Sequence, residues 1–353
     1  MKHVLFYGLI GLCIIFEAAC YSPPVQPSGE QISVEPDEEM ESIGEDIVFL
    51  ELPPVNADLP VSTFREVWAY LVADREQALN NNFPITDLVY FGAEVDAYGK
   101  LVNIPNFRNI SSFRGRKHFV ASCNGRALSY FVLAEGRPER DALIQDLLEA
   151  ARPYDGLQIN FEYVPARSGA AYLSFLRELR AGLGNKVFSV AIAARTRTLQ
   201  DDVYDYGRIL PIVDRILVMA YDEHWSTSAP GPIASMPWSQ RVARYSLDTI
   251  GPEKLIMGLP FYGRTWGDVN PNRAFYHVGI QRIHGEQGSP EISRENGIPT
   301  FKYETNVSIT VYYEDAYSLA TRMDMYKNMG VNAVGFWRLG QETPEVWPQI
   351  RLE

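Results

Sequence analysis

The hydrophobic and polar positions of this chain follow two alternating periods from residue 61 onwards. Short apolar runs, which are typical of buried strands, are followed by stretches with apolar residues every three to four positions, which is typical of helices. Leu173, Leu176 and Leu179 form one such stripe in a helix predicted over residues 170–183, and a second helix is predicted over 137–151. The predicted strands span residues 67–72, 87–95, 118–123, 156–163, 187–193, 215–221, 255–262 and 333–338.

Eight strands that alternate with helices predict an α/β fold in which a parallel sheet closes into a (β/α)8 TIM barrel. The pattern breaks between about residues 267 and 313, where Gly, Pro, Asn and Tyr are frequent. Short strands are predicted there at 299–303 and 308–313. We therefore expect one barrel domain over residues 61–353, with a small α+β insertion between strands seven and eight.

The first 19 residues have the features of a secretion signal. Lys2 and His3 precede an apolar run from Val4 to Phe16, and two alanines precede Cys20. This order is typical of a cleaved signal peptide, and it is similar to a bacterial lipoprotein signal, in which the cysteine carries the lipid. We expect an exported protein that is attached to a membrane of the cell envelope only through lipid on Cys20. A plain secretory signal and an uncleaved anchor are the alternatives.

Residues 20–60 are rich in Pro, Ser and acidic residues and contain ten Asp or Glu but no Lys or Arg. Such a composition predicts an extended, disordered tether. The whole chain has a formal net charge of -12 and a hydrophobic content of 46%. Since nucleic-acid binding requires clustered basic residues, the charge argues against a nucleic-acid partner. Cys123 would remain as a single cysteine in the mature protein, so no internal disulfide is expected.

One predicted strand has polar residues at every second position. Residues 154–163 read Tyr-Asp-Gly-Leu-Gln-Ile-Asn-Phe-Glu-Tyr, which places Gln158, Asn160 and Glu162 on one face. In a parallel barrel that face can line the lumen, while the apolar face packs against the outer helices. Glu162 would then lie at the carboxyl end of the strand, where barrel enzymes keep their catalytic groups.

This segment resembles the signature of glycoside hydrolase family 18, the chitinase family, at Asp155, Gly156 and Glu162. Family members commonly have Asp where Gln158 and Asn160 stand here. Three other predicted strand ends are similar to family segments: Met219-Ala220-Tyr221-Asp222, Pro260-Phe261-Tyr262-Gly263-Arg264 and Gly335-Phe336-Trp337-Arg338-Leu339-Gly340. The last segment is shared by spore-cortex and cell-wall hydrolases of bacteria, the subgroup that the chain most resembles.

The resemblance implies a glycosidase that acts on β-1,4-linked N-acetylglucosamine glycans, such as chitin oligomers or peptidoglycan. The family retains anomeric configuration by using the substrate's own acetamido group as the nucleophile. The catalytic residues carried over are Glu162 as the general acid, Asn160 and Tyr221 at the acetamido group, and Asp222. The substrate-binding residues carried over are Asp155, Gln158, Met219, Tyr262, Arg264 and Trp337.

Asn160 leaves a second function open. Without the usual carboxylate at this position, the groove could hold an amino-sugar glycan with little or no turnover, as a glycan-binding lipoprotein. No cofactor is expected, and the five His residues show no paired spacing typical of a metal site. The sequence does not select among chitin, peptidoglycan and N-glycan cores as the substrate.

Overall fold

The computed structural model describes residues 52, 54–55, 58–267, 273–304 and 308–353. The predicted signal peptide, the lipidation site at Cys20 and most of the predicted tether lie outside the described residues. Within the described residues, no helix has both the length and the apolar character needed to cross a membrane.

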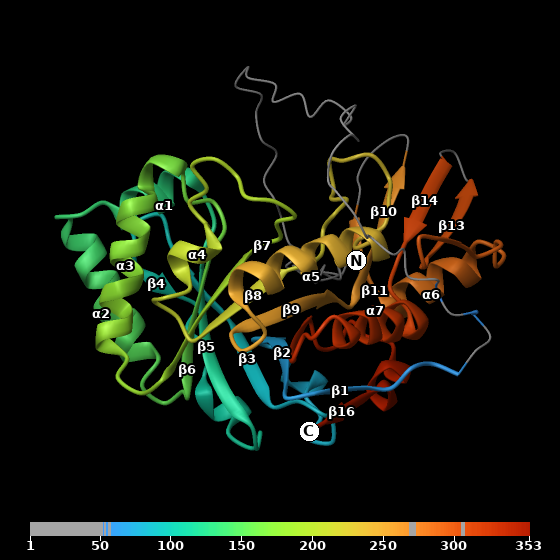
Figure 1. Cartoon of the computed structure of the whole chain (residues 1–353), viewed down its shortest axis with the longest axis horizontal. Coiled ribbons are helices and arrows are strands. Elements are labelled where there is room, and N and C mark those ends of the chain that lie inside the picture. The colour runs from blue at the N-terminus through green and yellow to red at the C-terminus, as the bar shows by residue number, and fades with distance from the viewer. Residues whose placement is uncertain (1–51, 53, 56–57, 268–272, 305–307) are drawn as a thin grey trace, which may run out of the picture. The chain divides into compact units, whose positions relative to one another are not determined.

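Eight parallel strands form the centre of the molecule (Figure 1). They pair in a ring that closes between β2 and β3, where Trp68 lies opposite Asp87, so the (β/α)8 TIM barrel predicted from the sequence is confirmed. The strands are β2 (Glu66–Val72), β3 (Asp87–Val95), β5 (Arg116–Cys123), β6 (Gly156–Phe161), β7 (Val187–Ala193), β8 (Arg215–Met219), β9 (Leu255–Pro260) and β15 (Ala333–Trp337).

Helices on the outside of the barrel cover the strands (Figure 1). They are α1 (Arg126–Leu133), α2 (Pro138–Ala150), α3 (Gly169–Gly182), α4 (Tyr206–Ile209), α5 (Met236–Ile250) and α7 (Ala316–Asn328). The predicted helices 137–151 and 170–183 correspond to α2 and α3. Between β2 and β3 the chain forms only the short 3-10 helix Glu76–Ala78, in a polar stretch that ends at Pro84.

The alternation of side chains along each strand separates two layers of core. Leu157, Ile159 and Phe161 of β6 belong to the large apolar cluster that includes residues of the outer helices. Gln158 and Asn160, on the other face of β6, are buried as well. A smaller apolar cluster fills the barrel interior with Trp68, Tyr70, Val89, Val120, Ala191, Leu217, Ile256 and Ala333. The polar face of β6 therefore points into the barrel, as predicted.

The insertion between β9 and β15 is a five-stranded antiparallel sheet with one helix. In spatial order its strands are β11 (Arg273–Tyr276), β10 (Tyr262–Gly267), β14 (Ser308–Tyr312), β13 (Ile298–Glu304) and β12 (Ser293–Glu295), and its helix is α6 (His277–Glu286). Strands β13 and β14 were predicted from the sequence. Strand β10 begins at Tyr262, inside the range predicted for the seventh barrel strand, because β9 ends at Pro260 and the chain turns directly into the insertion.

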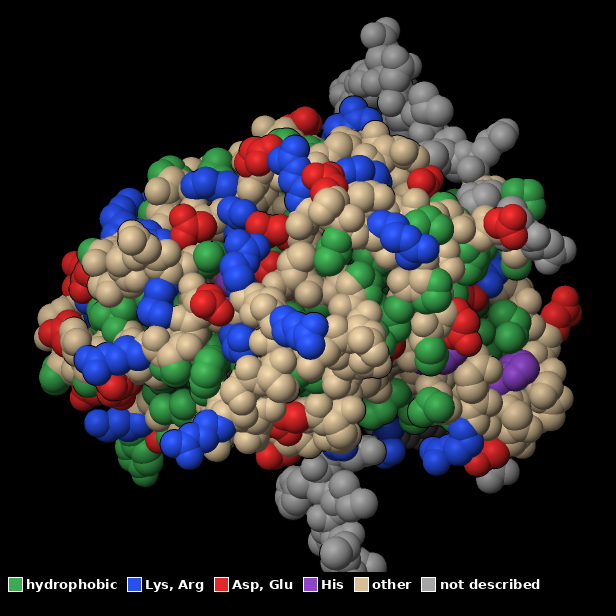
Figure 2. Space-filling view, turned by 90° about the horizontal axis from the view of Figure 1, so that it is seen from below, with side chains coloured by type: hydrophobic (Ala, Val, Ile, Leu, Met, Phe, Trp, Pro, Cys, Tyr) green, Lys and Arg blue, Asp and Glu red, His purple; other side chains and the backbone are tan. Residues whose placement is uncertain are grey.

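Two further pairings complete the fold. The short strands β1 (Ser62–Phe64) and β16 (Ile350–Leu352) pair in parallel, which joins the two ends of the barrel domain. Strand β4 (Leu101–Val102) forms a hairpin with β3. Figure 2, which views the molecule from below Figure 1, shows Lys and Arg side chains interspersed with Asp and Glu over this face.

A polar network lies where four barrel strands begin. Arg215 of β8 donates to Glu66 of β2 (2.6 Å), and Arg116 of β5 lies 2.9 Å from the same carboxylate. Arg116 also donates to Asp87 of β3 (2.7 Å), whose carboxylate is 2.7 Å from Nε2 of the buried His118. The network joins strands that lie far apart in the sequence.

Candidate active site

Glu162 directly follows the last residue of β6 and is exposed at the carboxyl end of the barrel. Its position follows from the alternation along β6, because Ile159 and Phe161 are held in the outer core and the residues between them face inward. The chain beyond the strand is fixed by Tyr204, whose hydroxyl donates to the Phe161 carbonyl (2.5 Å) and accepts from the Val164 N–H (2.9 Å). Tyr204 lies in the loop after β7 and was not singled out from the sequence.

The carboxyl group of Glu162 has a raised pKa. The main cause is the protein around it, which leaves the ionised form less hydrated than at an open surface. The negative charge of Asp222 raises the pKa further, whereas a hydrogen bond from Asn160 lowers it. A carboxyl group that substrate can reach and that keeps its proton to higher pH is suited to act as a general acid.

Asn160 is almost fully buried beside Glu162. Its Nδ2 donates to Oε1 of Glu162 (3.1 Å). Its Oδ1 is buried and has no hydrogen-bond partner among the described residues. Buried carbonyl oxygens are nearly always paired, so this oxygen is an acceptor whose hydrogen bond the described protein does not supply.

Gln158 lies deeper in the barrel than Asn160 and is fully buried. Its Oε1 accepts a hydrogen bond from the Tyr70 hydroxyl, and its Nε2 donates to Ser189 Oγ (3.1 Å). Both ends of this amide are therefore occupied by the protein. The structure therefore places Gln158 in a supporting position beneath Asn160.

Asp155 does not join this group of residues. It directly precedes Gly156, the first residue of β6, so it lies at the opposite end of the strand from Glu162. Its Oδ2 accepts a hydrogen bond from the Lys117 N–H (2.8 Å) where β5 and β6 begin. Asp155 is therefore not brought together with Glu162, and its carboxylate secures the start of two neighbouring strands.

Asp222 lies just beyond β8 and is held by two residues of β10. Its Oδ1 accepts hydrogen bonds from Nε (3.0 Å) and Nη2 (2.8 Å) of Arg264 and from the hydroxyl of Tyr262. The backbone of Asp222 has φ +58°, a left-handed conformation that Asp tolerates better than most residues. The preceding Tyr221 packs edge to face on Tyr262, with ring centroids 6.3 Å apart.

Trp337, the last residue of β15, is half-buried above the barrel interior. Its ring makes edge contacts with Tyr70 and Phe91, each with centroids 5.2 Å apart. It also packs against the cluster that contains Tyr262. Trp337 is therefore placed between the barrel and the insertion, where an indole face can support a pyranose ring.

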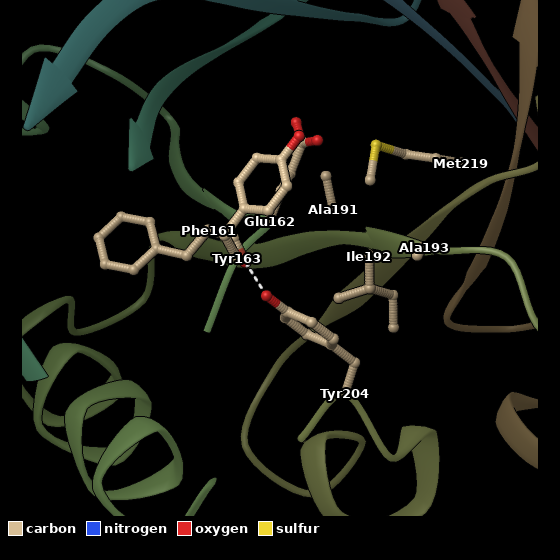
Figure 3. Close-up of a pocket in the computed structure, with 8 residues that line it drawn as sticks. All are labelled: Phe161, Glu162, Tyr163, Ala191, Ile192, Ala193, Tyr204 and Met219. Atoms are coloured by element: carbon tan, nitrogen blue, oxygen red, sulfur yellow. Dashed lines mark hydrogen bonds between the residues drawn. The ribbon is translucent and has the colours of Figure 1, made fainter. Parts of the chain in front are cut away.

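A small pocket of about 90 Å³ lies beside Glu162. Figure 3 shows that the Glu162 carboxylate and the Met219 side chain lie on one side of the pocket, while Tyr204 reaches the Phe161 carbonyl from the other. The pocket is lined by Phe161, Glu162, Tyr163, Ala191, Ile192, Ala193, Tyr204 and Met219. Among the residues that the structure describes, no group of three His, Cys, Asp or Glu could hold a metal ion.

The match to a protein family is consistent with this geometry. The profile of the family described as Glycosyl hydrolases family 18 matches residues 66–342, which include the whole barrel and its insertion. The chain belongs to this family. The spore-cortex resemblance noted from the sequence is also confirmed, since relatives with that role are among the most similar proteins.

The curated relatives include several proteins of Bacillus subtilis. The cortical fragment-lytic enzyme is 25% identical over 323 residues, which cover 84% of this chain and 74% of that protein. YdhD is 32% identical over 220 residues, which cover 58% of this chain and 51% of that protein. For the first three curated relatives, the match spans only 51% to 61% of the relative's own length.

The fold is also that of a solved structure, the spore cortex-lytic enzyme SleL of Bacillus cereus. The two chains superimpose with a TM-score of 0.74 at 22% sequence identity. The superposition covers 83% of this chain and 76% of the SleL chain. At this level of identity, the likeness establishes a shared barrel fold.

Proposed function

We propose that this protein hydrolyses β-1,4 links beside N-acetylglucosamine and retains the anomeric configuration, with Glu162 as the general acid. The observation that carries the proposal is the position of Glu162. Its carboxyl group is reachable from solvent at the barrel mouth, has a raised pKa and is hydrogen-bonded to Asn160. Family membership supports the reaction class.

In the first step, protonated Glu162 gives its proton to the glycosidic oxygen as the bond to the anomeric carbon breaks. The acetamido oxygen of the same sugar forms a bond to that carbon, so no carboxylate nucleophile is required. The Oδ1 of Asn160, which has no partner in the described protein, turns toward the sugar and accepts the acetamido N–H, which aligns the acetamido oxygen for attack. Tyr221 donates to the acetamido oxygen.

In the second step, Glu162 takes a proton from water, which attacks the anomeric carbon from the face that the leaving group left, while the bond from that carbon to the acetamido oxygen breaks and the acetamido group is restored. The sugar is released with its original configuration because inversion occurs twice. Asp222 is fixed by Arg264 and Tyr262 and presents its remaining carboxylate oxygen to the substrate. Trp337 would lie under the sugar ring, and Met219 would form the wall beside Glu162.

A second candidate function is binding without efficient turnover, and Asn160 favours it. An Asn cannot balance the positive charge of the cyclised intermediate as a carboxylate would. Purified protein incubated with chitin oligomers and with peptidoglycan distinguishes the two functions. Products that first appear in the β configuration by NMR support retaining hydrolysis. Tight binding with no product supports the glycan-binding function, and inverted product contradicts the proposed mechanism.

We also propose that the protein is exported and lipid-anchored through Cys20, on the strength of the charged start, the apolar run and Ala18-Ala19 before the cysteine. Metabolic labelling with a fatty-acid analogue is expected to mark the protein in a bacterial host. Replacement of the thiol in Cys20→Ser should abolish the label. A label that persists in this variant would exclude Cys20 as the lipidated residue.

A further inference from the structure

Arg338 differs from the other buried arginines among the described residues. Arg140 and Arg322 each bind a carboxylate through two nitrogens, at 2.9 and 2.7 Å to Glu178 and at 3.1 and 3.0 Å to Glu314. The Arg338 side chain, only 9% exposed as a residue, has no carboxylate within 4 Å in the described part of the chain. A guanidinium removed from water normally has a counter-charge.

The only hydrogen bond of the Arg338 side chain to a described residue joins Nη2 to the hydroxyl of Tyr276 (2.8 Å). The guanidinium also lies over the Tyr276 ring, 5.3 Å from its centroid. The Nε atoms of Arg140 and Arg322 are sealed from solvent and have no hydrogen-bond partner among the described residues. No nitrogen of the Arg338 side chain is in that state. The unused donors of Arg338 are therefore open to a molecule that arrives from solvent.

The position of Tyr276 places these donors beside the active site. Tyr276 of β11 lies directly opposite Tyr262 of β10 in the antiparallel sheet. Because opposed residues project to the same face of a sheet, Tyr276 is on the face that presents Tyr262 to Asp222. Arg338 follows Trp337, which packs against the same cluster as Tyr262.

The two Arg–Tyr pairs at this place provide an internal comparison. Arg264 lies over the Tyr262 ring at 5.4 Å and binds the carboxylate of Asp222. Arg338 lies over the Tyr276 ring at 5.3 Å, and no carboxylate of the described chain is bound to it. The second pair thus has the arrangement of the first without its anion. Guanidinium groups suit carboxylates because their parallel N–H groups match the two oxygens.

We propose that Arg338 binds a carboxylate carried by the substrate, at a sugar next to the one that lies on Trp337. The substrate class is then an amino-sugar glycan with an acidic substituent, such as the 3-O-lactyl group of muramic acid, and not a neutral polymer of N-acetylglucosamine. This inference rests on the proposed function. It adds a specificity residue that the acetamido chemistry does not require.

The charge of the chain is compatible with such a substrate. Ten of the acidic residues lie in residues 20–60, with no Lys or Arg there, so most of the net charge of -12 is outside the barrel domain. An acidic glycan would therefore meet a barrel with almost balanced charge. Repulsion between exposed charges is in any case limited to about 10 Å at moderate salt.

The experiment compares three ligands: a neutral N-acetylglucosamine oligomer, peptide-free glycan strands with free lactyl carboxylates, and the same strands with those carboxylates converted to methylamides. Arg338→Met is compared with the native protein and with Arg282→Met, which removes an exposed arginine of α6 that lies near Glu286. Arg338→Lys keeps the charge but not the paired donors. Thermal melting checks that each variant is folded.

Arg338→Met should lower kcat/KM for the carboxylate strands by about ten- to a hundredfold, the range for a charge-assisted hydrogen bond. The kcat/KM of Arg338→Met for the neutral oligomer and for the methylamide strands should stay within about twofold of the native value. The same range is expected for Arg282→Met with all three ligands. Affinity of the native protein for carboxylate strands should fall as salt rises, and Arg338→Met should lose this dependence while Arg338→Lys keeps it.

Equal losses on all three ligands, or an unchanged value on the carboxylate strands, would overturn the proposal. Fluorescence titration with each ligand separates it from the proposed function. If the native protein cleaves nothing but binds carboxylate strands through Arg338, the hydrolytic function fails and the carboxylate site stands. If the native protein cleaves the neutral oligomer but does not distinguish carboxylate strands from methylamide strands, the hydrolytic function stands and the carboxylate site fails.

Discussion

At the scale of single residues, Asn160 determines how well this site can work. Its Nδ2 donates to Glu162, and its Oδ1 is left for the substrate. An Asp at this place would share a proton with Glu162 and offer negative charge to the cyclised intermediate. Asn keeps the geometry of attack but supplies only an amide dipole. We therefore interpret Asn160 as a residue that slows the chemical step and preserves binding.

Asn160→Asp is expected to raise the rate of hydrolysis of an N-acetylglucosamine oligomer by roughly two to three powers of ten, with little change in binding. The new negative charge should raise the pKa of Glu162 further, because like charges disfavour ionisation. Since the general acid acts in its protonated form, the fall of kcat/KM on the alkaline side should move to higher pH. A variant that is slower than the native protein across the pH range would show instead that Asn160 is tuned for catalysis.

At the scale of elements, periodicity alone located the barrel. Each of the eight predicted strands overlaps one of the observed barrel strands, because buried parallel strands are continuous apolar runs. The predictions failed at strand ends. The observed strands β6, β8 and β9 end at Phe161, Met219 and Pro260. The apolar sequence continues beyond these ends into residues that line the mouth. An aromatic residue that packs at the mouth resembles a strand residue in the sequence.

The insertion was predicted only in part for a related reason. Strands β13 and β14 pair with each other and are only three residues apart in the sequence, so their apolar runs stand out locally. Strands β10, β11 and β12 are short or polar, and β10 pairs with β14, more than 40 residues later. Likewise, the sequence indicated Glu162, Asp222 and Trp337 by their strand-end positions, but Tyr204 and Tyr276 carry no local signal.

An ion pair joins the segment that follows β14 to helix α7. Glu314 and Arg322 are both fully buried, and Arg322 also donates to the Ala234 carbonyl (2.6 Å). Glu314→Gln should lower the free energy of unfolding by about 3–5 kcal/mol, because it leaves a buried guanidinium without its counter-charge. The double variant Glu314→Leu with Arg322→Met should recover part of this loss in urea denaturation. If the losses of Glu314→Leu alone and Arg322→Met alone add up to the loss of the double variant, the two residues are not coupled and the prediction is contradicted.

At the scale of the whole molecule, the network beneath the barrel joins its two halves. Arg215 and Glu66 are 149 residues apart in the sequence and meet across the barrel. Such a contact depends on barrel closure, so no local pattern could predict it. Burial alone would raise the pKa of Glu66, but hydrogen bonds from Arg215, Trp68 and Arg116 lower it to about 2 from an ordinary value of 4.5.

This lowered pKa predicts how stability changes with pH. The contribution of Glu66 is complete above pH 4.5 and is lost as the pH falls from there to about 2, because the unfolded chain takes up the proton first. At 1.36 kcal/mol per pH unit, it amounts to about 3 kcal/mol. Glu66→Gln should lose this amount at neutral pH and show a flatter acid limb. Equal pH dependence in both proteins would contradict the prediction.

The central claim is that Glu162 supplies the proton for glycosidic cleavage, and single-turnover hydrolysis by Glu162→Gln tests it most directly. The amide keeps the shape of the side chain but has no proton to give, so the rate of cleavage of a bound glycan should fall by about 10²- to 10⁴-fold. Affinity for the same glycan, measured by fluorescence titration, should stay within about twofold of the native value. Cleavage by Glu162→Gln at the native rate would contradict the account.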